Sequence, residues 1–273
     1  MDRDSLQLGK KSCRKLGPNM QAVSSLQRYF PTMVEERMFI RESNLAFYQR
    51  WLFDGVKLKD KTVLDIGAGA GLNSFYAACN GARTVICLEP EVQGSTAGVT
   101  EKFSRVKQRL GLDNIRMEPE LFQSFDCGSE KFDVILLHNS INHLDEPACI
   151  DLLTDENARR NYRRIFSKIA ALARPGTKLI VVDCSRHNFF GALGLKNPIN
   201  PTIEWKKHQA PKVWARMLAD AGFENPRIRW ASFNTLGDFG RFFLGNKWLA
   251  FFLKSHFCLT MSKGDTAGVS RRR

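Results

Sequence analysis

Residues 63–71 read VLDIGAGAG, a short apolar run that ends in a glycine-rich turn. The next residues, Leu72 to Cys79, have a helical pattern, and Asn80-Gly81 is typical of a helix C-terminus. A glycine-rich turn between a strand and a helix lets a ligand approach the backbone and use the helix N-terminus. The segment therefore predicts a strand–turn–helix unit with a ligand site at the turn.

Further predicted strands and helices alternate along the chain. Further apolar runs predict strands at Thr84–Leu88, Ile115–Met117, Phe132–Leu137 and Leu179–Asp183. Helical stripes lie between them, roughly over Val92–Leu110 and residues 158–173, and Arg174-Pro175-Gly176 breaks the second. Alternation of strand and helix at this spacing indicates parallel βαβ units. After a helix that opens at Pro211, two final strands are expected over Arg227–Phe233 and His256–Met261, with an aromatic stretch between them.

Composition excludes several classes of protein. The 273 residues are 43% hydrophobic and 25% charged, values that rule out a disordered or collagen-like chain. The seven cysteines are scattered without a CxxC pair, which favours reduced thiols over a disulfide framework and gives no metal site. We expect no transmembrane segment and no signal peptide, and hence a cytoplasmic protein.

The net charge of +13 is unevenly distributed. Residues 61–150 carry −4, whereas residues 151–273 carry 22 Lys and Arg against 9 Asp and Glu. Charge of this kind bears on partners, not on the fold. An acidic acceptor, a nucleic acid or an anionic membrane surface would each suit it, and so would a plain solvated surface.

Two acidic residues refine the identity of the ligand at the glycine turn. Leu72 stands where a dinucleotide fingerprint needs a small residue, and no Gly-Lys-Ser/Thr follows as a phosphate-binding P-loop requires. Asp65 would repel a pyrophosphate but suits a ligand with an ammonium group. Glu89, 24 residues further on at the end of the second strand, can accept both hydroxyls of a ribose. S-adenosylmethionine has the ribose and the ammonium and carries no phosphate.

The chain resembles the class I S-adenosylmethionine-dependent methyltransferases in four segments. These are VLDIGAGAG at 63–71, LEP at 88–90, FDVILLHNSINHLDE at 132–146 and LARPGTKLIVVD at 172–183. The resemblance covers roughly residues 50–185 and, more loosely, 227–261. It implies an α/β, doubly wound, mostly parallel seven-stranded sheet with the last strand antiparallel, here with an N-terminal helical cap.

On this basis the chain divides into four parts. Residues 1–19 are expected to be a mobile basic arm, and residues 20–56 a helical cap of two or three helices broken near Pro31. Residues 57–263 would form the methyltransferase domain. Residues 264–273 would be a basic tail.

The resemblance also implies a set of cofactor-binding residues. Asp65, Gly67, Gly69 and Gly71 would hold the methionine part, and Glu89 the ribose. The segment Glu120-Leu121-Phe122 would lie on the adenine. The complete expected set is Asp65, Gly67, Ala68, Gly69, Gly71, Glu89, Pro90, Leu121, Phe122, His138 and Asn139.

Methyl transfer requires an aligned nucleophile and sometimes the removal of its proton. Catalytic candidates should lie at the carboxyl ends of the fourth and fifth strands, where open α/β sheets bind ligands. His138, His143 and Asp183 stand there. Each has a plainer alternative: His138 would only line the cofactor pocket, His143 would pack in its turn, and Asp183 would orient a neighbour.

Acceptor-binding residues are expected just after the fifth strand and before the helix at Pro211. They are Arg186, His187, Lys206, Lys207 and His208, and their charge favours an anionic acceptor. The segment after the fourth strand lacks the Asp/Asn-Pro-Pro-aromatic turn of amino-directed DNA methylases, and no Pro-Cys pair exists for cytosine-C5 chemistry.

The sequence therefore predicts a methyltransferase acting on a small molecule or glycan precursor, with oxygen favoured as the acceptor atom. Three alternatives stay open. They are an RNA methyltransferase whose basic arm and Arg271-Arg272-Arg273 tail grip phosphates, a membrane-surface enzyme for a lipid-linked acceptor, and a cofactor-binding protein without turnover.

Overall fold

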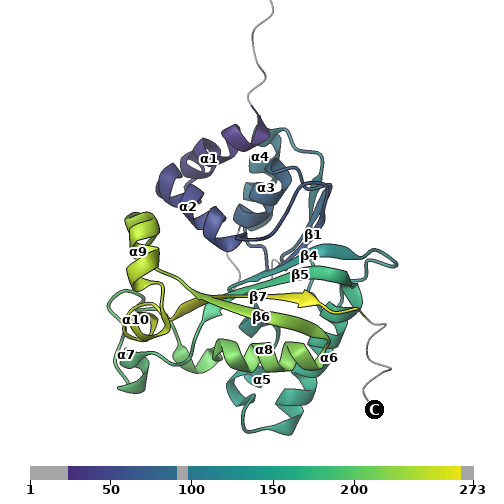
Figure 1. Ribbon diagram of the computed structural model, residues 1–273. Helices are drawn as coiled ribbons and strands as arrows, with labels where there is room; N and C mark the ends of the chain where they lie inside the picture. The colour runs from purple at the N-terminus through teal and green to yellow at the C-terminus, as the bar shows by residue number, and fades with distance from the viewer. Residues whose placement is uncertain (1–23, 91–97, 266–273) are drawn as a thin grey trace, which may run out of the picture.

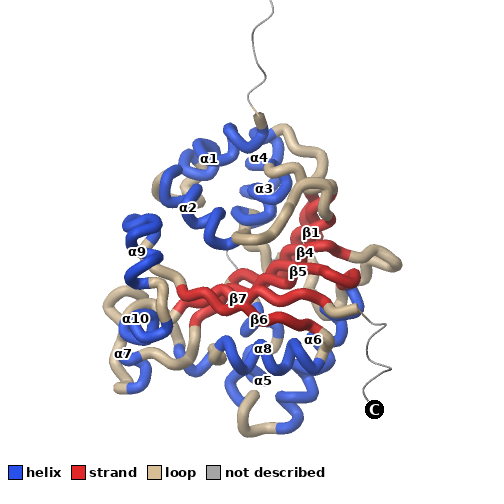
Figure 2. The backbone as a smooth tube through the Cα atoms, in the orientation of Figure 1, coloured by secondary structure: helices blue, strands red, loops and turns tan. Residues whose placement is uncertain are grey.

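A seven-stranded sheet forms the centre of the molecule, with the strand order β3-β2-β1-β4-β5-β7-β6 (Figures 1 and 2). The computed structural model describes residues 24–90 and 98–265. The expected arm, nearly all of the expected tail and the expected start of a helix at Val92 lie outside the described residues. The strands are β1 (Thr62–Ile66), β2 (Thr84–Leu88), β3 (Ile115–Glu118), β4 (Phe132–His138), β5 (Ala173–Cys184), β6 (Phe223–Trp230) and β7 (His256–Lys263).

Strand directions confirm the expected fold. The pairs β1–β2, β1–β4, β2–β3 and β4–β5 are parallel, whereas β7 runs antiparallel to both β5 and β6. The carboxyl ends of β1, β2, β4 and β5 consequently meet at one edge of the sheet. Cys184, the last residue of β5, pairs with His256, the first of β7, at this same edge.

Helices cover both faces of the sheet (Figure 1). One face carries α1 (Ser25–Glu35), α2 (Glu42–Leu52), α3 (Leu72–Cys79) and α4 (Val99–Leu110), and the other carries α5 (Glu146–Asp151), α6 (Glu156–Leu172) and α8 (Pro211–Asp220). The short elements are α7 (Phe189–Ala192), α9 (Gly237–Leu244), α10 (Lys247–Phe252), η1 (Ile141–Leu144), η2 (Trp205–Lys207) and η3 (Asn234–Leu236). No helix within residues 24–90 and 98–265 is long and apolar enough to cross a membrane.

The central strands are apolar throughout because each of their faces contributes to a separate core. In β1, Leu64 and Ile66 join the core under α6 and α8, while Val63 joins the core under α1 to α4. In β4, Ile135 likewise joins the core under α6 and α8, and Leu136 joins the core under α1 to α4. This alternation is the two-residue period of a strand buried on both sides.

Helix α1 corrects one expectation, since Pro31 lies inside it and does not break it. Proline removes one backbone hydrogen bond, which weakens a helix but does not end it when packing compensates. Tyr29 and Met33, on either side of Pro31, are fully buried, and the Tyr29 hydroxyl donates a hydrogen bond to the carbonyl oxygen of Leu72 (3.0 Å). Tertiary contacts with α3 therefore keep α1 continuous.

Strands β5 and β6 start earlier than the sequence suggests. The Arg174-Pro175-Gly176 segment ends α6 at Leu172, as expected, but forms the first part of β5. The edge strand β6 covers Phe223–Trp230, not Arg227–Phe233, with a register shift between Glu224 and Arg227. Proline is tolerated at such a bulge in an edge strand, so the Asn-Pro pair inside β6 does not end it.

A buried tryptophan tests the core under α6 and α8. Trp214 is fully buried, and its ring centroid lies 5.1 Å from that of Tyr162 and 5.9 Å from that of Phe166. We expect Trp214→Ala to lower the free energy of unfolding by about 3–5 kcal/mol, because it leaves a large cavity. Urea denaturation measures this. Trp248→Ala, at a side chain 75% exposed, is the matched control and should change stability by less than about 0.5 kcal/mol. Equal effects of the two substitutions would contradict the packing described.

Candidate active site

The turn between β1 and α3 needs glycine at two positions. Gly67 has φ +73°, and a Cβ added there would overlap the Cβ of Ser140 after β4. Gly71 has φ +85° and is the N-cap of α3, where a Cβ would lie 2.8 Å from the Phe103 ring. Both residues need positive φ and close approach, which glycine alone allows without strain. The glycine spacing noted in the sequence thus has a steric cause.

Glu89 fixes the middle of this turn. Its Oε2 accepts a hydrogen bond from the backbone N–H of Gly69 at 2.7 Å. The backbone N–H groups of Gly67 and Ala68 donate to the carbonyl oxygen of Leu88, the residue before it, at 2.8 Å and 3.0 Å. The end of β2 therefore holds the glycine turn against the end of β1.

Asp65 is a buried carboxylate at the end of β1. It is 1% exposed, and its Oδ2 accepts a hydrogen bond from the Ser74 hydroxyl on α3 at 2.5 Å. Its Oδ1 has no hydrogen-bond partner among the described residues. Burial raises the pKa of Asp65 to about 7; the Ser74 hydrogen bond lowers this pKa, and the nearby Glu89 raises it.

A cavity of about 480 Å³ opens beside this turn, at the ends of β1, β2 and β4. It brings together residues that are far apart in the sequence. Of the residues expected from the sequence, Gly67, Glu89, Pro90, Leu121, Phe122, Asn139 and His143 line it. The cavity volume, the carboxylate of Glu89 in its wall and the unpartnered oxygen of Asp65 fit the cofactor that the resemblance implies. In that cofactor an ammonium group would compensate the charge of Asp65.

His138, at the end of β4, faces the N-terminal helices. Its Nε2 shares a short hydrogen bond with the hydroxyl of Tyr48 on α2. Burial, with a smaller contribution from His256, lowers the pKa of His138 to about 4, so the ring is neutral at pH 7. Tyr48 is a site residue that the sequence reasoning missed, because nothing in the helical pattern distinguishes it from a core position.

Asp183, near the end of β5, is paired with His208. The Nδ1 of His208 lies 2.9 Å from Asp183 Oδ1, which also accepts the backbone N–H of Cys184 at 2.7 Å. Asp183 is 1% exposed, whereas the His208 side chain is 14% exposed. The carboxylate therefore lies beneath the ring and orients it, while one edge of the ring stays accessible.

His256, at the start of β7, is a second residue missed by the sequence reasoning. Its Nε2 lies 3.1 Å from the Cys184 sulfur and its Nδ1 lies 2.8 Å from the Lys254 carbonyl oxygen. Burial lowers its pKa. The antiparallel return of β7 places this histidine beside the ends of β4 and β5, which a local pattern could not show.

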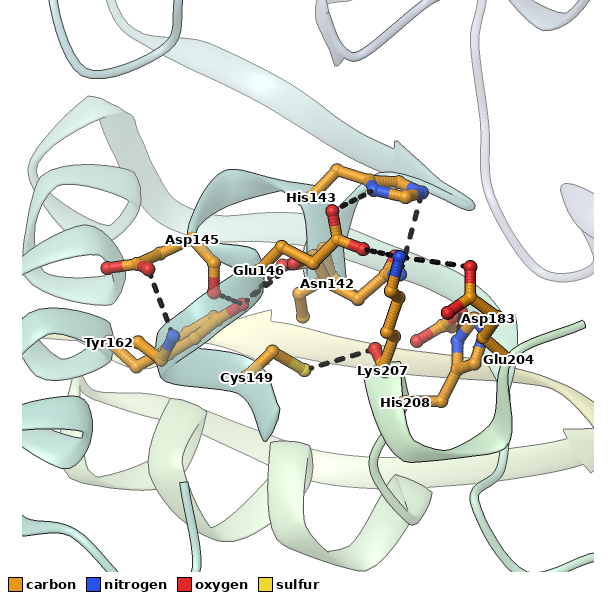
Figure 3. A network of polar contacts seen from close by, with 12 residues as sticks. Asn142, His143, Asp145, Glu146, Cys149, Tyr162, Asp183, Glu204, Lys207 and His208 are labelled. Carbon is orange, nitrogen blue, oxygen red and sulfur yellow. Dashed lines mark hydrogen bonds and ion pairs between the residues drawn. The ribbon is translucent and has the colours of Figure 1, made fainter. Parts of the chain in front are cut away.

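Lys207 precedes His208 in the sequence, and its side chain forms an ion pair with Glu146, a residue that lines the cavity (Figure 3). Its Nζ lies 2.7 Å from Glu146 and 3.0 Å from Glu204. Glu146 also faces His143, with 3.9 Å between Glu146 Oε2 and His143 Nδ1. Two carboxylates thus surround the charge of Lys207, and η2 is tied to α5.

Three other residues that were expected to bind the acceptor lie together at η2. Arg186, His187 and Lys206 line a small cavity of about 260 Å³ next to Trp205. Arg186 donates from Nη1 to the Gln209 side-chain oxygen at 3.2 Å. In the described part of the chain no group of three His, Cys, Asp or Glu side chains has the arrangement of a metal site.

Comparisons with known proteins bear on the same region. Residues 36–235 match the family described as "Methyltransferase domain". A 131-residue segment is 28% identical to protein arginine N-methyltransferase 6 of Danio rerio, and spans 47% of this chain but only 38% of that protein. A 186-residue segment is 26% identical to the ubiquinone biosynthesis O-methyltransferase of Hahella chejuensis, 66% of this chain and 69% of that protein.

Solved structures share the fold at low sequence identity. A putative S-adenosylmethionine-dependent methyltransferase from Listeria monocytogenes superposes with a TM-score of 0.53 at 11% identity, over 82% of this chain and 100% of that one. An S-adenosylmethionine-dependent methyltransferase from Mesorhizobium loti gives 0.52 at 12% identity, over 79% and 96%. At this identity the likeness establishes the fold.

Glu89 provides a first test of the cavity. We expect Glu89→Gln to weaken binding of S-adenosylhomocysteine by about 1–3 kcal/mol, the usual loss when a hydrogen bond to a charged group is weakened. Titration calorimetry measures the affinity. Glu101→Gln on α4, at a side chain that is 84% exposed, is the control and should bind as the unmodified protein does. Unchanged affinity in Glu89→Gln would remove Glu89 from the ribose site.

The raised pKa of Asp65 gives a pH dependence. Folding favours its protonated form, so this contribution to stability is present at low pH and is lost as pH rises through about 7. A ligand ammonium favours the ionised form. Affinity for S-adenosylhomocysteine should therefore rise about tenfold from pH 6 to pH 8, as the ionised fraction rises from about one tenth to nine tenths. In Asp65→Asn the affinity should be independent of pH in this range; a flat profile in the unmodified protein would refute the contact.

Proposed function

The chain belongs to the S-adenosylmethionine-dependent methyltransferases of the methyltransferase domain family, and we propose that it methylates a hydroxyl group of a small molecule or glycan precursor. The Asp183–His208 pair is the observation that carries this proposal. Transfer to a hydroxyl requires a base near the acceptor, because an alcohol is a weak nucleophile until its proton is removed.

The geometry of the pair suits a general base. Asp183 accepts the Nδ1 hydrogen of His208, which leaves Nε2 with a free lone pair. The buried carboxylate also stabilises the imidazolium that forms when Nε2 takes up a proton. Asp183 is therefore a positioning residue, and His208 is the proposed proton acceptor.

The proposed reaction needs one nucleophile and one base. Bound S-adenosylmethionine supplies an electrophilic methyl group. The acceptor oxygen would take the methyl group as the carbon–sulfur bond of the donor breaks, and the hydroxyl proton would pass to His208 Nε2. The glycine turn and Glu89 would hold the donor, and alignment of the two reactants would contribute to the rate.

The two other histidine candidates are less suited to this role. His138 shares its Nε2 with the Tyr48 hydroxyl, so this nitrogen is not available to an acceptor. His143 does line the cavity, but its side chain is 60% exposed and lies near Glu146 at 3.9 Å. Both remain predictions from the sequence that compete with His208.

The acceptor is proposed to be anionic. Arg186 and Lys206 share a cavity beside the strand ends, and no ion pair neutralises either of them among the described residues. Lys207 is less suited, since Glu146 and Glu204 surround it. The O-methyltransferase named above, which aligns over two thirds of this chain, supports an oxygen acceptor.

Substitution of the pair tests the assignment. We expect His208→Gln to lower kcat about 10²–10⁴-fold, because the hydroxyl proton then has no acceptor. Asp183→Asn should also lower kcat, since it can fix the wrong tautomer of His208. Affinity for S-adenosylhomocysteine should stay unchanged in both variants. If His143→Gln abolished turnover while His208→Gln did not, His143 would be the base.

Isotopically labelled S-adenosylmethionine identifies the acceptor. The enzyme is incubated with the labelled donor and a cell extract, and the products are analysed by mass spectrometry. A methyl ether on a compound of low mass supports the proposal. Label in nuclease-sensitive material would establish the RNA alternative instead, and that outcome would overturn the acceptor class proposed here.

A further inference from the structure

Helices α9 and α10 expose an unusual number of aromatic side chains. Phe239, Phe242, Phe243, Trp248 and Phe252, called here the aromatic patch, are between 48% and 81% exposed. No other Phe or Trp in the described part of the chain is classed as exposed. Leaving so much apolar surface in water costs free energy that burial against a partner would recover, and such patches mark interaction sites.

Cations accompany the aromatic patch. Residues 239–254 contain Arg241, Lys247 and Lys254 and no acidic residue. Lys247 lies over the ring of Trp248 at 5.8 Å, and Lys254 over that of Phe233 at 4.7 Å. The first contact places Lys247 at the same surface as the aromatic patch, and the second places Lys254 next to it in the fold.

Two carboxylates, Asp54 and Asp238, lie near this surface, and cations outnumber them; Asp238 is in the first turn of α9. Asp54, just after α2, pairs with Arg227, Arg229 and Arg241 at 2.9–3.4 Å. One negative and three positive charges leave a net charge of +2 in this cluster. With Asp238, Lys247 and Lys254 also counted, five positive and two negative side chains leave this surface with a net charge of +3.

We propose that α9 and α10 dock the protein on an anionic lipid bilayer. Aromatic side chains and cations on short amphipathic helices are the combination that lies at the boundary of head groups and acyl chains. The helices have eight and six residues, so they would rest in the interface without crossing it. A second copy of the chain is a poorer occupant, because a two-fold interface would bring the three cations of one patch against the same three of the other.

The position of the aromatic patch connects it to the site. Helices α7, α9 and α10 gather at the end of the sheet where β5 ends and β7 begins (Figure 1). The side chain of Asn188, just after β5, donates hydrogen bonds to the Phe251 carbonyl oxygen (3.1 Å) and to the Ser255 hydroxyl (2.8 Å). The C-terminal end of α10 is thus tied to the segment that follows Asp183.

An apolar cavity lies between the patch and the strand ends. Its volume is about 640 Å³, with Trp248 and Phe251 among its walls on the patch side and Ser185 and His187 after β5. A hydrocarbon chain leaving the bilayer would find apolar walls here, and the attached polar group would reach the acceptor side of the sheet. We infer, on the basis of the proposed function, that the methyl acceptor is an amphiphile with an anionic head group.

Vesicle binding tests the docking without any methyl transfer, so it is independent of the proposed function. The full chain is sedimented with phosphatidylcholine vesicles and with vesicles that also contain phosphatidylglycerol. We expect preferential binding to the anionic vesicles, weakened by added salt. Absence of binding to both kinds of vesicle would overturn the docking.

Paired substitutions locate the contact. Phe242→Ser with Trp248→Ser should weaken vesicle binding at least about tenfold. The control pair Ile40→Ser with Leu153→Ser removes exposed apolar side chains elsewhere and should bind normally. Unchanged affinity for S-adenosylhomocysteine shows that each variant is folded. Equal losses of vesicle binding in the two double variants would refute the aromatic patch as the contact. Self-association of the protein that the patch substitutions abolish would also refute lipid docking.

Trp248 also reports on insertion. Brominated acyl chains should quench part of the tryptophan fluorescence of the bound protein, and Trp248→Phe should remove that part while preserving binding. The inference that the acceptor is an amphiphile is tested by solvent extraction of the labelled products. Label in the organic phase supports the inference, whereas label confined to the aqueous phase refutes it. The result on vesicle binding is unaffected by either outcome.

Discussion

Two buried carboxylates at the carboxyl ends of parallel strands constrain the whole site. Asp65 is the last residue but one of β1, Asp183 is the last but one of β5, and each is 1% exposed. A carboxylate removed from water must find donors or a counter-charge. Ser74 supplies one donor to Asp65, and His208 supplies one to Asp183. Each carboxylate retains one oxygen without a partner among the described residues, so each can accept a further hydrogen bond.

The surroundings of these two carboxylates differ between the β1–β2 half of the sheet and the β5 half. The Asp65 half, with its glycine turn and Glu89, is rigid, because backbone N–H groups and buried rings fix each turn of the chain. The Asp183 half is built from loops after β5 and before α8, which differ more among proteins of one fold. A rigid half would suit the binding of a common donor, and a half built from loops would suit the selection of an acceptor.

The proposed acceptor and the aromatic patch have a common physical basis. Exposed aromatic side chains on α9 and α10, and an apolar cavity with Trp248 and Phe251 among its walls, lie at the end of the sheet where β5 ends and β7 begins. If both proposals hold, this arrangement would guide an amphiphile from a lipid surface to the methyl donor. The positive C-terminal half of the chain would then contribute to binding at an anionic surface.

The sequence by itself determined the fold and the donor, because strand periodicity and glycine spacing are local properties, and the individual donor-binding positions stay predictions. Only the tertiary structure decided that His208 pairs with Asp183, that His138 faces Tyr48, and that Lys207 is surrounded by Glu146 and Glu204. It also kept α1 continuous through Pro31 and left the α9–α10 rings in solvent. These features depend on packing between segments far apart in the chain, and side-chain partners of that kind leave no periodic signal in the sequence.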